Sequence, residues 1–324
     1  PLEIRLASVR SIKFPPAERT TNKSGEFAFE LANGDVIRGR LVEWAPDSVK
    51  VRSARFGLLA IHSRALRQLY RLEKKASLIF ASLAGMQDWT SPDEQSGDWK
   101  EDGDHLWTDQ PGASLTGQLG VPDRAVVEVE LSWKDSPDFV FAIGVDSLSP
   151  EAKVDGWRLE TVGDTLAIVR EYDKTADVDF VAKLSNRTSV RLTVFLDQKS
   201  GTMKAFVDDD QPGGQVFEES TADRNRRRRP GRDVRVINRG SQLRIERLRV
   251  SQWLGAIPAR RQAGQSSIAL SDGKFVSGAI RGFDKESKSL LIGGEDEDSS
   301  IELEDVIAIR FGSPQSPRES AQCA

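Results

Sequence analysis

Paired carboxylates are the residues in this sequence whose spacing could support bond cleavage. A Glu-x-Asp pair stands at Glu171 and Asp173, and a Glu-x-Glu pair at Glu128 and Glu130. Side chains at i and i+2 of a strand share one face, and retaining glycoside hydrolysis needs an acid and a nucleophile about 5 Å apart. No third acid follows the first pair, and the second is typical of the solvent face of an amphipathic strand. We therefore assign no catalytic residue and consider enzymatic activity the less favoured interpretation.

A second constellation joins aromatic rings to polar side chains, the combination that carbohydrate sites use because sugars present both apolar ring faces and hydroxyl groups. Tyr172 closes an alternating run and is the better candidate for an exposed ring. Trp133 and Trp157 alternate in phase with apolar residues, which favours burial of both. The candidate ligand-binding residues are Trp157, Arg158, Glu160, Arg170, Tyr172 and Arg191.

A basic run could dock a polyanion or an acidic partner, such as the Glu295–Asp298 segment of a neighbouring copy. It comprises Arg226, Arg227, Arg228, Arg229 and Arg232. The alternative interpretation is a solvated hairpin loop. No aromatic residue lies in this run to stack on bases, so nucleic-acid binding is not favoured.

Metal ligands are scarce. Cys323 is the single cysteine, and His62 and His105 are the two histidines, which excludes an internal disulfide framework and a thiolate cluster and disfavours a Ser/His/Asp triad. Two groups of aspartates, 208–210 and those at 173, 177 and 179, lack the spacing of a calcium loop. Turn chemistry accounts for them, so we expect no cofactor and no metal, with calcium as the alternative.

Composition places the chain among globular proteins long enough for two or three domains. Its 324 residues are 38% apolar and 30% charged. Lys and Arg number 46 against 50 Asp and Glu, which gives no basic excess suited to DNA. The apolar stretches are too short to span a membrane. Because Pro1 does not begin a natural reading frame, we expect the polypeptide to extend upstream.

Two segments are copies of one unit of about fifty residues. Leu31–Asp35 aligns with Leu270–Lys274, Gly39 aligns with Gly278, and the match continues with one inserted residue. The Asn-Gly and Asp-Gly pairs predict two-residue hairpins, in which both central residues need positive φ. The two aligned glycines would permit a sharp bend in a barrel wall.

This pattern of a hydrophobic residue, Asp-Gly, a hydrophobic residue and Gly resembles the Sm-like or SH3-like repeats of bacterial envelope proteins. The resemblance implies small five-stranded barrels at 24–73 and 264–312. Residues 1–14 repeat the spacing of the closing strands, as in Ile4 and Ile301. We interpret them as the end of a truncated upstream unit; alternatively they complete the C-terminal unit or pair with a partner chain. Residues 313–324 are expected to be a disordered tail.

Between the copies, residues 76–255 show strand-like alternation separated by turn clusters, which predicts an antiparallel two-sheet sandwich. The segments 156–160, 196–205 and 248–253 resemble concanavalin A-like and laminin-G-like jelly rolls, including bacterial keto-disaccharide hydrolase-like and lectin modules.

The sequence thus predicts an all-β protein: a central two-sheet jelly-roll sandwich flanked by two small five-stranded SH3/Sm-like barrels. The expected function is non-catalytic binding or assembly in the bacterial cell envelope. The sandwich would recognise carbohydrate or protein, and the barrels would act as docking modules or spacers. A glycan-processing enzyme or its inactive descendant is the alternative. The expected partners are a glycan, another envelope protein or a second copy, and the resemblance implies an extracytoplasmic location.

Overall fold

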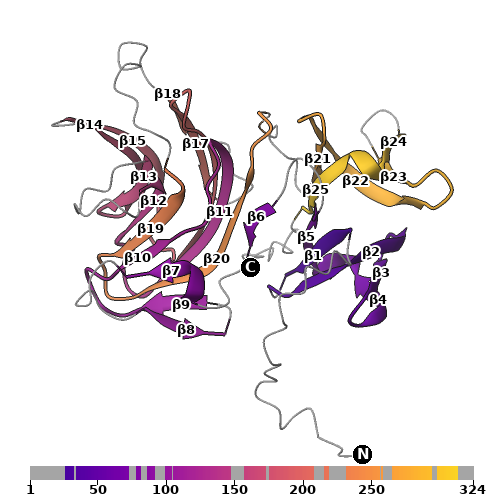
Figure 1. The fold of residues 1–324 in the computed structure, drawn as a ribbon, viewed down its shortest axis with the longest axis horizontal. Helices are drawn as coiled ribbons and strands as arrows, with labels where there is room; N and C mark the ends of the chain where they lie inside the picture. The colour runs from indigo at the N-terminus through magenta and orange to yellow at the C-terminus, as the bar shows by residue number, and fades with distance from the viewer. Residues whose placement is uncertain are drawn as a thin grey trace, which may run out of the picture.

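The computed structural model describes residues 26–32, 34–72, 78–81, 86–91, 99–103, 105–146, 157–172, 175–207, 215–218, 231–255, 257, 265–293 and 298–312. Within these residues the regular structure is β, apart from three short 3₁₀ turns: η2 (Ser63–Ala65), η3 (Met86–Asp88) and η5 (Leu303–Asp305). The strands form one sandwich and one separate sheet (Figure 1). The predicted all-β class with a two-sheet sandwich is confirmed.

The first copy of the repeat contains five strands: β1 (Phe27–Leu31), β2 (Val36–Ala45), β3 (Ser48–Ser53), β4 (Gly57–His62) and β5 (Leu66–Arg71). The second copy contains β21 (Ser266–Leu270), β22 (Phe275–Asp284), β23 (Ser289–Gly293), β24 (Asp298–Glu302) and β25 (Val306–Arg310). In both copies the fifth strand pairs with the first, and the second, third and fourth strands follow in sequence order across the sheet. The register shifts also correspond. The pairing of β2 with β3 shifts after Leu41, and the pairing of β22 with β23 shifts after Ile280, which is likewise the sixth residue of its strand.

The two copies pair with each other rather than lying at opposite ends of the sandwich. Strand β5 pairs antiparallel with β25, and Leu69 lies opposite Ile309. These two residues are equivalent in the repeat, so the joint is a pseudo-twofold contact of the kind seen in symmetric dimers. The result is a ten-stranded sheet with one shared hydrophobic core. No β4–β5 or β24–β25 ladder occurs among the pairings of the described strands, and barrel closure stays a prediction.

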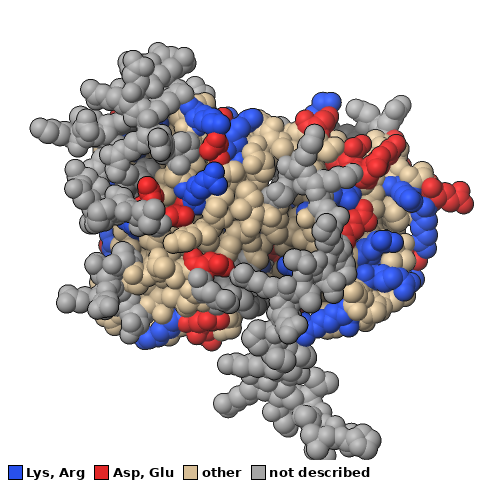
Figure 2. Space-filling model, viewed as in Figure 1, with Lys and Arg blue, Asp and Glu red and all other residues tan. Residues whose placement is uncertain are grey.

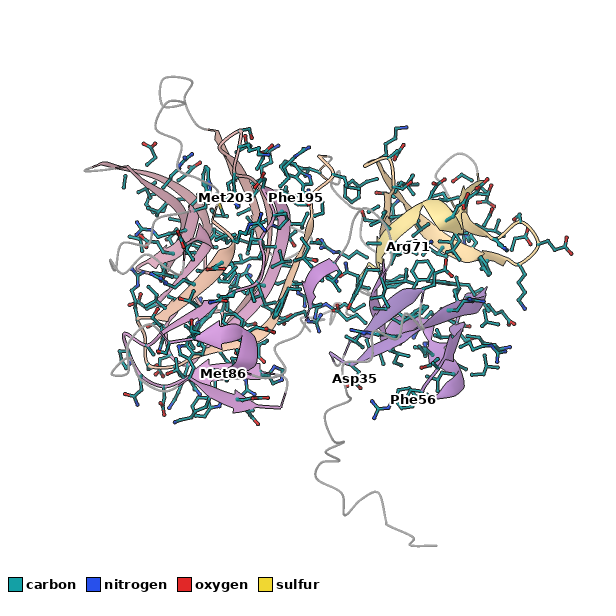
Figure 3. All side chains as sticks on the ribbon, in the orientation of Figure 1. Asp35, Phe56, Arg71, Met86, Phe195 and Met203 are labelled. Atoms are coloured by element: carbon teal, nitrogen blue, oxygen red, sulfur yellow. The ribbon has the colours of Figure 1, made fainter. Side chains whose placement is uncertain are left out.

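Arg71 of the first repeat forms hydrogen bonds with the second repeat (Figure 3). Its Nε donates to the carbonyl of Val306 at 2.8 Å, a second nitrogen donates to the carbonyl of Leu303, and Nη1 pairs with Glu26 at 2.7 Å. The guanidinium also lies 4.4 Å from the ring centre of Phe27. A buried arginine is stable only when its donors are satisfied, and here the other repeat supplies two of the acceptors.

The predicted two-residue hairpins are wrong. Leu31 N–H donates to the carbonyl of Asp35, and Leu270 N–H to that of Lys274, so each loop holds three residues. Gly34 has a φ of 96° and Gly273 of 87°, whereas Asp272 has no positive φ. A three-residue loop needs the left-handed conformation only at its last position, and that is where both glycines stand.

The sandwich consists of a seven-stranded and an eight-stranded sheet. The seven-stranded sheet has the order β15 (Thr175–Lys183), β14 (Thr165–Tyr172), β13 (Trp157–Val162), β12 (Phe139–Val145), β19 (Asp233–Asn238), β10 (Ser114–Gly117) and β7 (Trp89–Thr90). The eight-stranded sheet has the order β18 (Gln215–Glu218), β17 (Thr202–Val207), β16 (Ser189–Asp197), β11 (Arg124–Trp133), β20 (Leu243–Gln252), β9 (His105–Thr108) and β8 (Lys100–Asp102). Its eighth strand, β6 (Leu78–Ala81), also pairs with β20.

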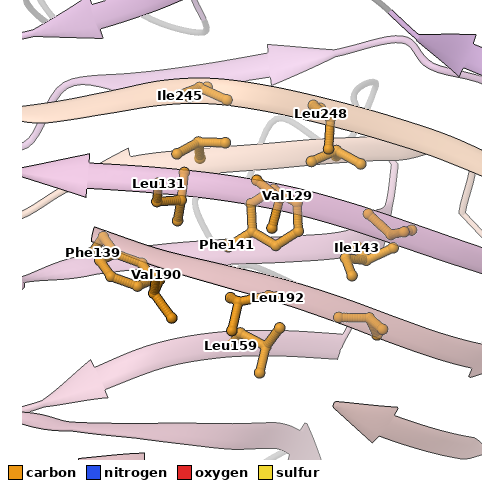
Figure 4. Packing of buried hydrophobic residues seen from close by; sticks show 14 of the residues in the cluster. Val129, Leu131, Phe139, Phe141, Ile143, Leu159, Val190, Leu192, Ile245 and Leu248 are labelled. Carbon is orange, nitrogen blue, oxygen red and sulfur yellow. The ribbon is translucent and has the colours of Figure 1, made fainter. Parts of the chain in front are cut away.

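The core lies between these two sheets, because apolar residues alternate along most of the strands and point inward. Figure 4 shows Val129 and Leu131 of β11 packing near Phe139 and Phe141 of β12. The eight-stranded sheet faces the repeat module, as Figure 1 shows, and the seven-stranded sheet lies on the far side of the sandwich. The expected segments 1–14 and 313–324 lie outside the described residues.

We predict that Gly39→Ala and Gly278→Ala each destabilise the protein by about 1–3 kcal/mol through overpacking. A Cβ at Gly39 would lie 2.8 Å from the carbonyl oxygen of Arg52, and one at Gly278 would lie 2.8 Å from that of Gly293. Gly282→Ala is the matched control, because its Cβ would meet nothing closer than 3.5 Å. Urea unfolding measures the change. Equal stability of Gly39→Ala and Gly282→Ala would contradict the packing argument.

Candidate functional site

Charged residues occupy the outer face of the eight-stranded sheet, where it meets the repeats. Glu128 and Glu130 lie on β11, with Arg249 and Arg247 opposite them on β20. On the other side, Arg191 of β16 lies opposite Glu130. Glu130 therefore stands between arginines on both neighbouring strands, an arrangement that favours cross-strand ion pairs.

The repeat module completes this cluster with its own charges. Arg310 of β25 donates to Glu128, and Glu30 of β1 accepts from Arg247 and, at 3.4 Å, from Arg249. Arg67 of β5 bonds Glu130 at 3.0 Å. We call the eight residues the interface cluster: Glu30, Arg67, Glu128, Glu130, Arg191, Arg247, Arg249 and Arg310.

Burial distinguishes these charges from those on the visible surface of the repeat module, where acidic and basic side chains lie next to one another in solvent (Figure 2). The side chains of Arg249 and Glu30 are each 6% exposed. The expectation of a solvent face for Glu128 and Glu130 is wrong, since their side chains are only 14% and 25% exposed. The repeat module covers the face, and arginines replace the water.

The cluster controls the protonation of its members. Burial raises the pKa of Glu128, but the charges and hydrogen bonds of Arg249 and Arg310 outweigh it and hold that pKa at about 2. Burial lowers the pKa of Arg249, but Glu128 and Glu30 raise it by more. The pKa of Arg67 falls because of burial and the nearby charges of Arg191 and Arg247.

A cavity of about 120 Å³ adjoins the cluster between the sandwich and the repeat module. Its walls are mostly apolar, and Tyr70, Phe195, Trp253 and Phe275 line it. The rings of Phe195 and Trp253 meet edge to face, with centres 5.7 Å apart. Such a pocket between two modules, with a few polar groups at one end, has the character of a small-molecule site.

Four of the predicted ligand-binding residues lie on the neighbouring strands β13 and β14: Trp157, Arg158, Glu160 and Arg170. Trp157 is 4% exposed and belongs to the sandwich core, with the Arg170 guanidinium 4.4 Å from its ring centre. Trp157 is therefore no exposed platform. Arg158 and Glu160 point outward from β13, while Arg191 lies on the other sheet in the interface cluster.

Other predicted residues fall outside what the structure describes. The side chains of Glu171 and Tyr172, and all of Asp173, are among these, as are Arg226, Arg227, Arg228 and Arg229. Arg232 is described and exposed. Of the candidate calcium ligands only Asp177 and Asp179, both on β15, are described. Within the described residues no group of three His, Cys, Asp or Glu side chains could hold a metal ion.

The outer face of the seven-stranded sheet carries a row of side chains that crosses six strands. Register places them side by side in the order Val178, Val169, Arg158, Ala142, Arg235 and Thr116. Arg235 Nε donates to Thr116 Oγ1 at 3.0 Å, and Arg158 approaches Glu160 at 3.9 Å. In the next row Phe180, 56% exposed, shares this face with Ala167 and Glu160.

Sequence reasoning missed Phe180 and Arg235. Phe180 stands in the run 175–183, where Val178 and Phe180 alternate with Asp177 and Asp179. Arg235 alternates with Val234 and Val236, a pattern that marks a polar outer face. The alternation was the available signal for both.

No protein-family model matches the sequence, and no curated protein matches it. Among solved structures, a sialidase is similar with 12% identity and a TM-score of 0.39 over 63% of this chain and 21% of that chain. The carbohydrate-binding module CBM66 from Bacillus subtilis has 12% identity and a TM-score of 0.34 over 51% and 92%. The exoplasmic/lumenal domain of VIP36, bound to Ca²⁺ and Man3GlcNAc, has 12% identity and a TM-score of 0.39 over 56% and 89%.

The chain thus spans about a fifth of the sialidase, and none of these likenesses assigns it to a family. Among the described residues, no helix is long and apolar enough to cross a lipid bilayer.

We predict that stability falls as pH drops from 4.5 towards 2, partly because of Glu128. Its folded pKa of about 2 lies below its ordinary value of 4.5, so its ionised form stabilises the fold above pH 4.5, and the contribution disappears as pH falls through 2. The shift corresponds to about 3 kcal/mol. Urea unfolding at several pH values should give a flatter profile for Glu128→Gln than for the wild type.

The control for this profile is Glu43→Gln. Glu43 also has a lowered pKa, from hydrogen bonds with Lys285 and Lys50, but it is on the surface. Solvent screening makes such pairs contribute little, so this variant should keep the wild-type slope. An unchanged slope in Glu128→Gln would show that the interface cluster does not hold that carboxylate ionised.

Proposed function

We propose that this protein binds carbohydrate without cleaving it, through the outer face of its seven-stranded sheet. The repeat module occupies the opposite side of the sandwich, against the eight-stranded sheet. The proposal rests on one observation: an exposed phenyl ring and a set of bonded polar side chains share that outer face.

The chemistry of the face suits a sugar. Phe180 and Val178 expose apolar surface of 56% and 48%, onto which the C–H face of a pyranose ring can pack. Arg158 and Glu160 lie two strands away, or roughly 10 Å at the usual strand spacing. Both side chains are 16% exposed, and Glu160 also pairs with Arg239 at 3.8 Å. Their fixed positions favour binding, because little side-chain freedom is lost when hydroxyl groups pair with them.

The repeat module serves in this proposal as a rigid support and docking module. Buried ion pairs attach the repeat module to the sandwich, and the two repeats share one hydrophobic core. The module would therefore hold the sandwich with the outer face of its seven-stranded sheet exposed. A role in the bacterial cell envelope, outside the cytoplasm, and association with envelope proteins or a second copy belong to the same proposal. The resemblance of the two copies to the Sm-like or SH3-like repeats of bacterial envelope proteins supports them.

We predict that Phe180→Ala weakens glycan binding about tenfold or more, since covering a phenyl side chain contributes about 1.5–3 kcal/mol. A glycan array identifies oligosaccharides that bind the wild type, and titration calorimetry with the best of them gives the affinity. Phe56→Ala is the matched control, because Phe56 is 54% exposed but lies on the repeat module.

The expected result is a loss confined to Phe180→Ala. Failure of the wild type to bind any oligosaccharide of the array, or equal affinity of both variants and the wild type, would refute the proposed face.

A further inference from the structure

A second, smaller cavity of about 40 Å³ lies inside the interface cluster. It is lined by all eight members of the cluster together with Gln68, Val129 and Phe311. Because a cavity needs about 10–15 Å³ to hold one water molecule, this one has room for about three water molecules. It is therefore a polar chamber between the two modules and is separate from the apolar cavity beside it.

More arginines than glutamates line this chamber. Five arginines and three glutamates line it, an excess of two positive charges among the described residues. Each of these carboxylates pairs with more than one arginine. Glu130 pairs with Arg67 and Arg191, at 3.0 and 3.4 Å, and Glu128 pairs with Arg249 and Arg310. Partly buried charge is costly unless an opposite charge compensates it.

Three of the guanidinium groups converge from both modules. Arg67 comes from β5 of the repeat module, and Arg191 and Arg247 come from β16 and β20 of the sandwich. Their side chains are 20%, 34% and 21% exposed, so solvent reaches them in part. Arg67 shares Glu130 with Arg191 and Glu30 with Arg247, which brings the three positive charges close together. Burial, and then the charges of Arg191 and Arg247, lower the pKa of Arg67.

We propose that this chamber binds a small doubly charged oxyanion, a phosphate or sulfate group, between Arg67, Arg191 and Arg247. Guanidinium forks match the geometry of such oxygens and form strong charge-assisted hydrogen bonds with them. Two negative charges would cancel the excess, and a ligand held by residues of both modules would stabilise their association. The inference does not depend on the proposed carbohydrate face.

The test uses titration calorimetry of the full chain with inorganic phosphate at constant ionic strength, with chloride as the balancing anion. The wild type should bind one phosphate saturably. Arg191→Gln should weaken binding at least tenfold, and Arg191→Lys should recover part of it. Arg191 is the most exposed member of the cluster at 34%, which makes it the substitution least disruptive to folding, and urea unfolding without phosphate checks that the variant is folded.

Arg244→Gln is the matched control. Arg244 lies on β20 with 30% of its side chain exposed, but it pairs with Asp102 at 3.0 Å and does not line the chamber. Its phosphate affinity should equal that of the wild type. Phe180→Ala should also bind phosphate normally, which keeps this test independent of the glycan test.

Glucose 6-phosphate distinguishes the two sources of such a group. Tighter binding than inorganic phosphate, lost in Arg191→Gln, would identify a phosphorylated sugar as the ligand class, whereas weaker binding would identify the free anion. Either result supports the site. Absence of saturable phosphate and sulfate binding, or equal binding by the wild type and Arg191→Gln, would overturn it.

Discussion

Buried pairing between Glu128 of the sandwich and Arg310 of the repeat module is the contact on which the arrangement of this protein depends. Glu128 also bonds Arg249, which reaches Gln68 of the repeat module at 2.5 Å. Removing one partner of such a network leaves an uncompensated buried charge, and that penalty keeps the modules in a single arrangement. The outer face of the eight-stranded sheet is thereby committed to contact with the repeat module, which lies away from the seven-stranded sheet.

The repeat module can offer these charges because its two copies form one sheet. Pairing of Leu69 with Ile309 puts β5 and β25 side by side, so that Arg67 and Gln68 from one copy and Arg310 from the other reach the sandwich together. The copies are not equivalent in detail. Arg71 bonds carbonyls of the second repeat, whereas its counterpart Phe311 packs on Trp44, with ring centres 5.5 Å apart. The two copies thus share a strand order and a symmetric joint, but they differ in the contacts made by equivalent residues.

The strands were predictable because they follow from periodicity and turn chemistry within short stretches of sequence. Burial of Trp157 was favoured on the same basis. The site was less predictable, since alternation shows which residues leave the core but not what they meet outside it. Glu128 and Glu130 were therefore placed in solvent, and Arg191 was grouped with Arg158 although the two lie on different sheets. The edge pairing of β5 with β25 depends on contacts distant in sequence, which no local pattern contains.

A double-mutant cycle between Glu128 and Arg310 measures how far this ion pair holds the two modules together. The free energy of unfolding is measured by urea titration for the wild type, Glu128→Gln, Arg310→Gln and the double variant. We expect a coupling energy of at least about 1 kcal/mol, because the two side chains bond across the module interface. Effects that add to within about 0.3 kcal/mol would contradict it, since the modules would then associate without this ion pair.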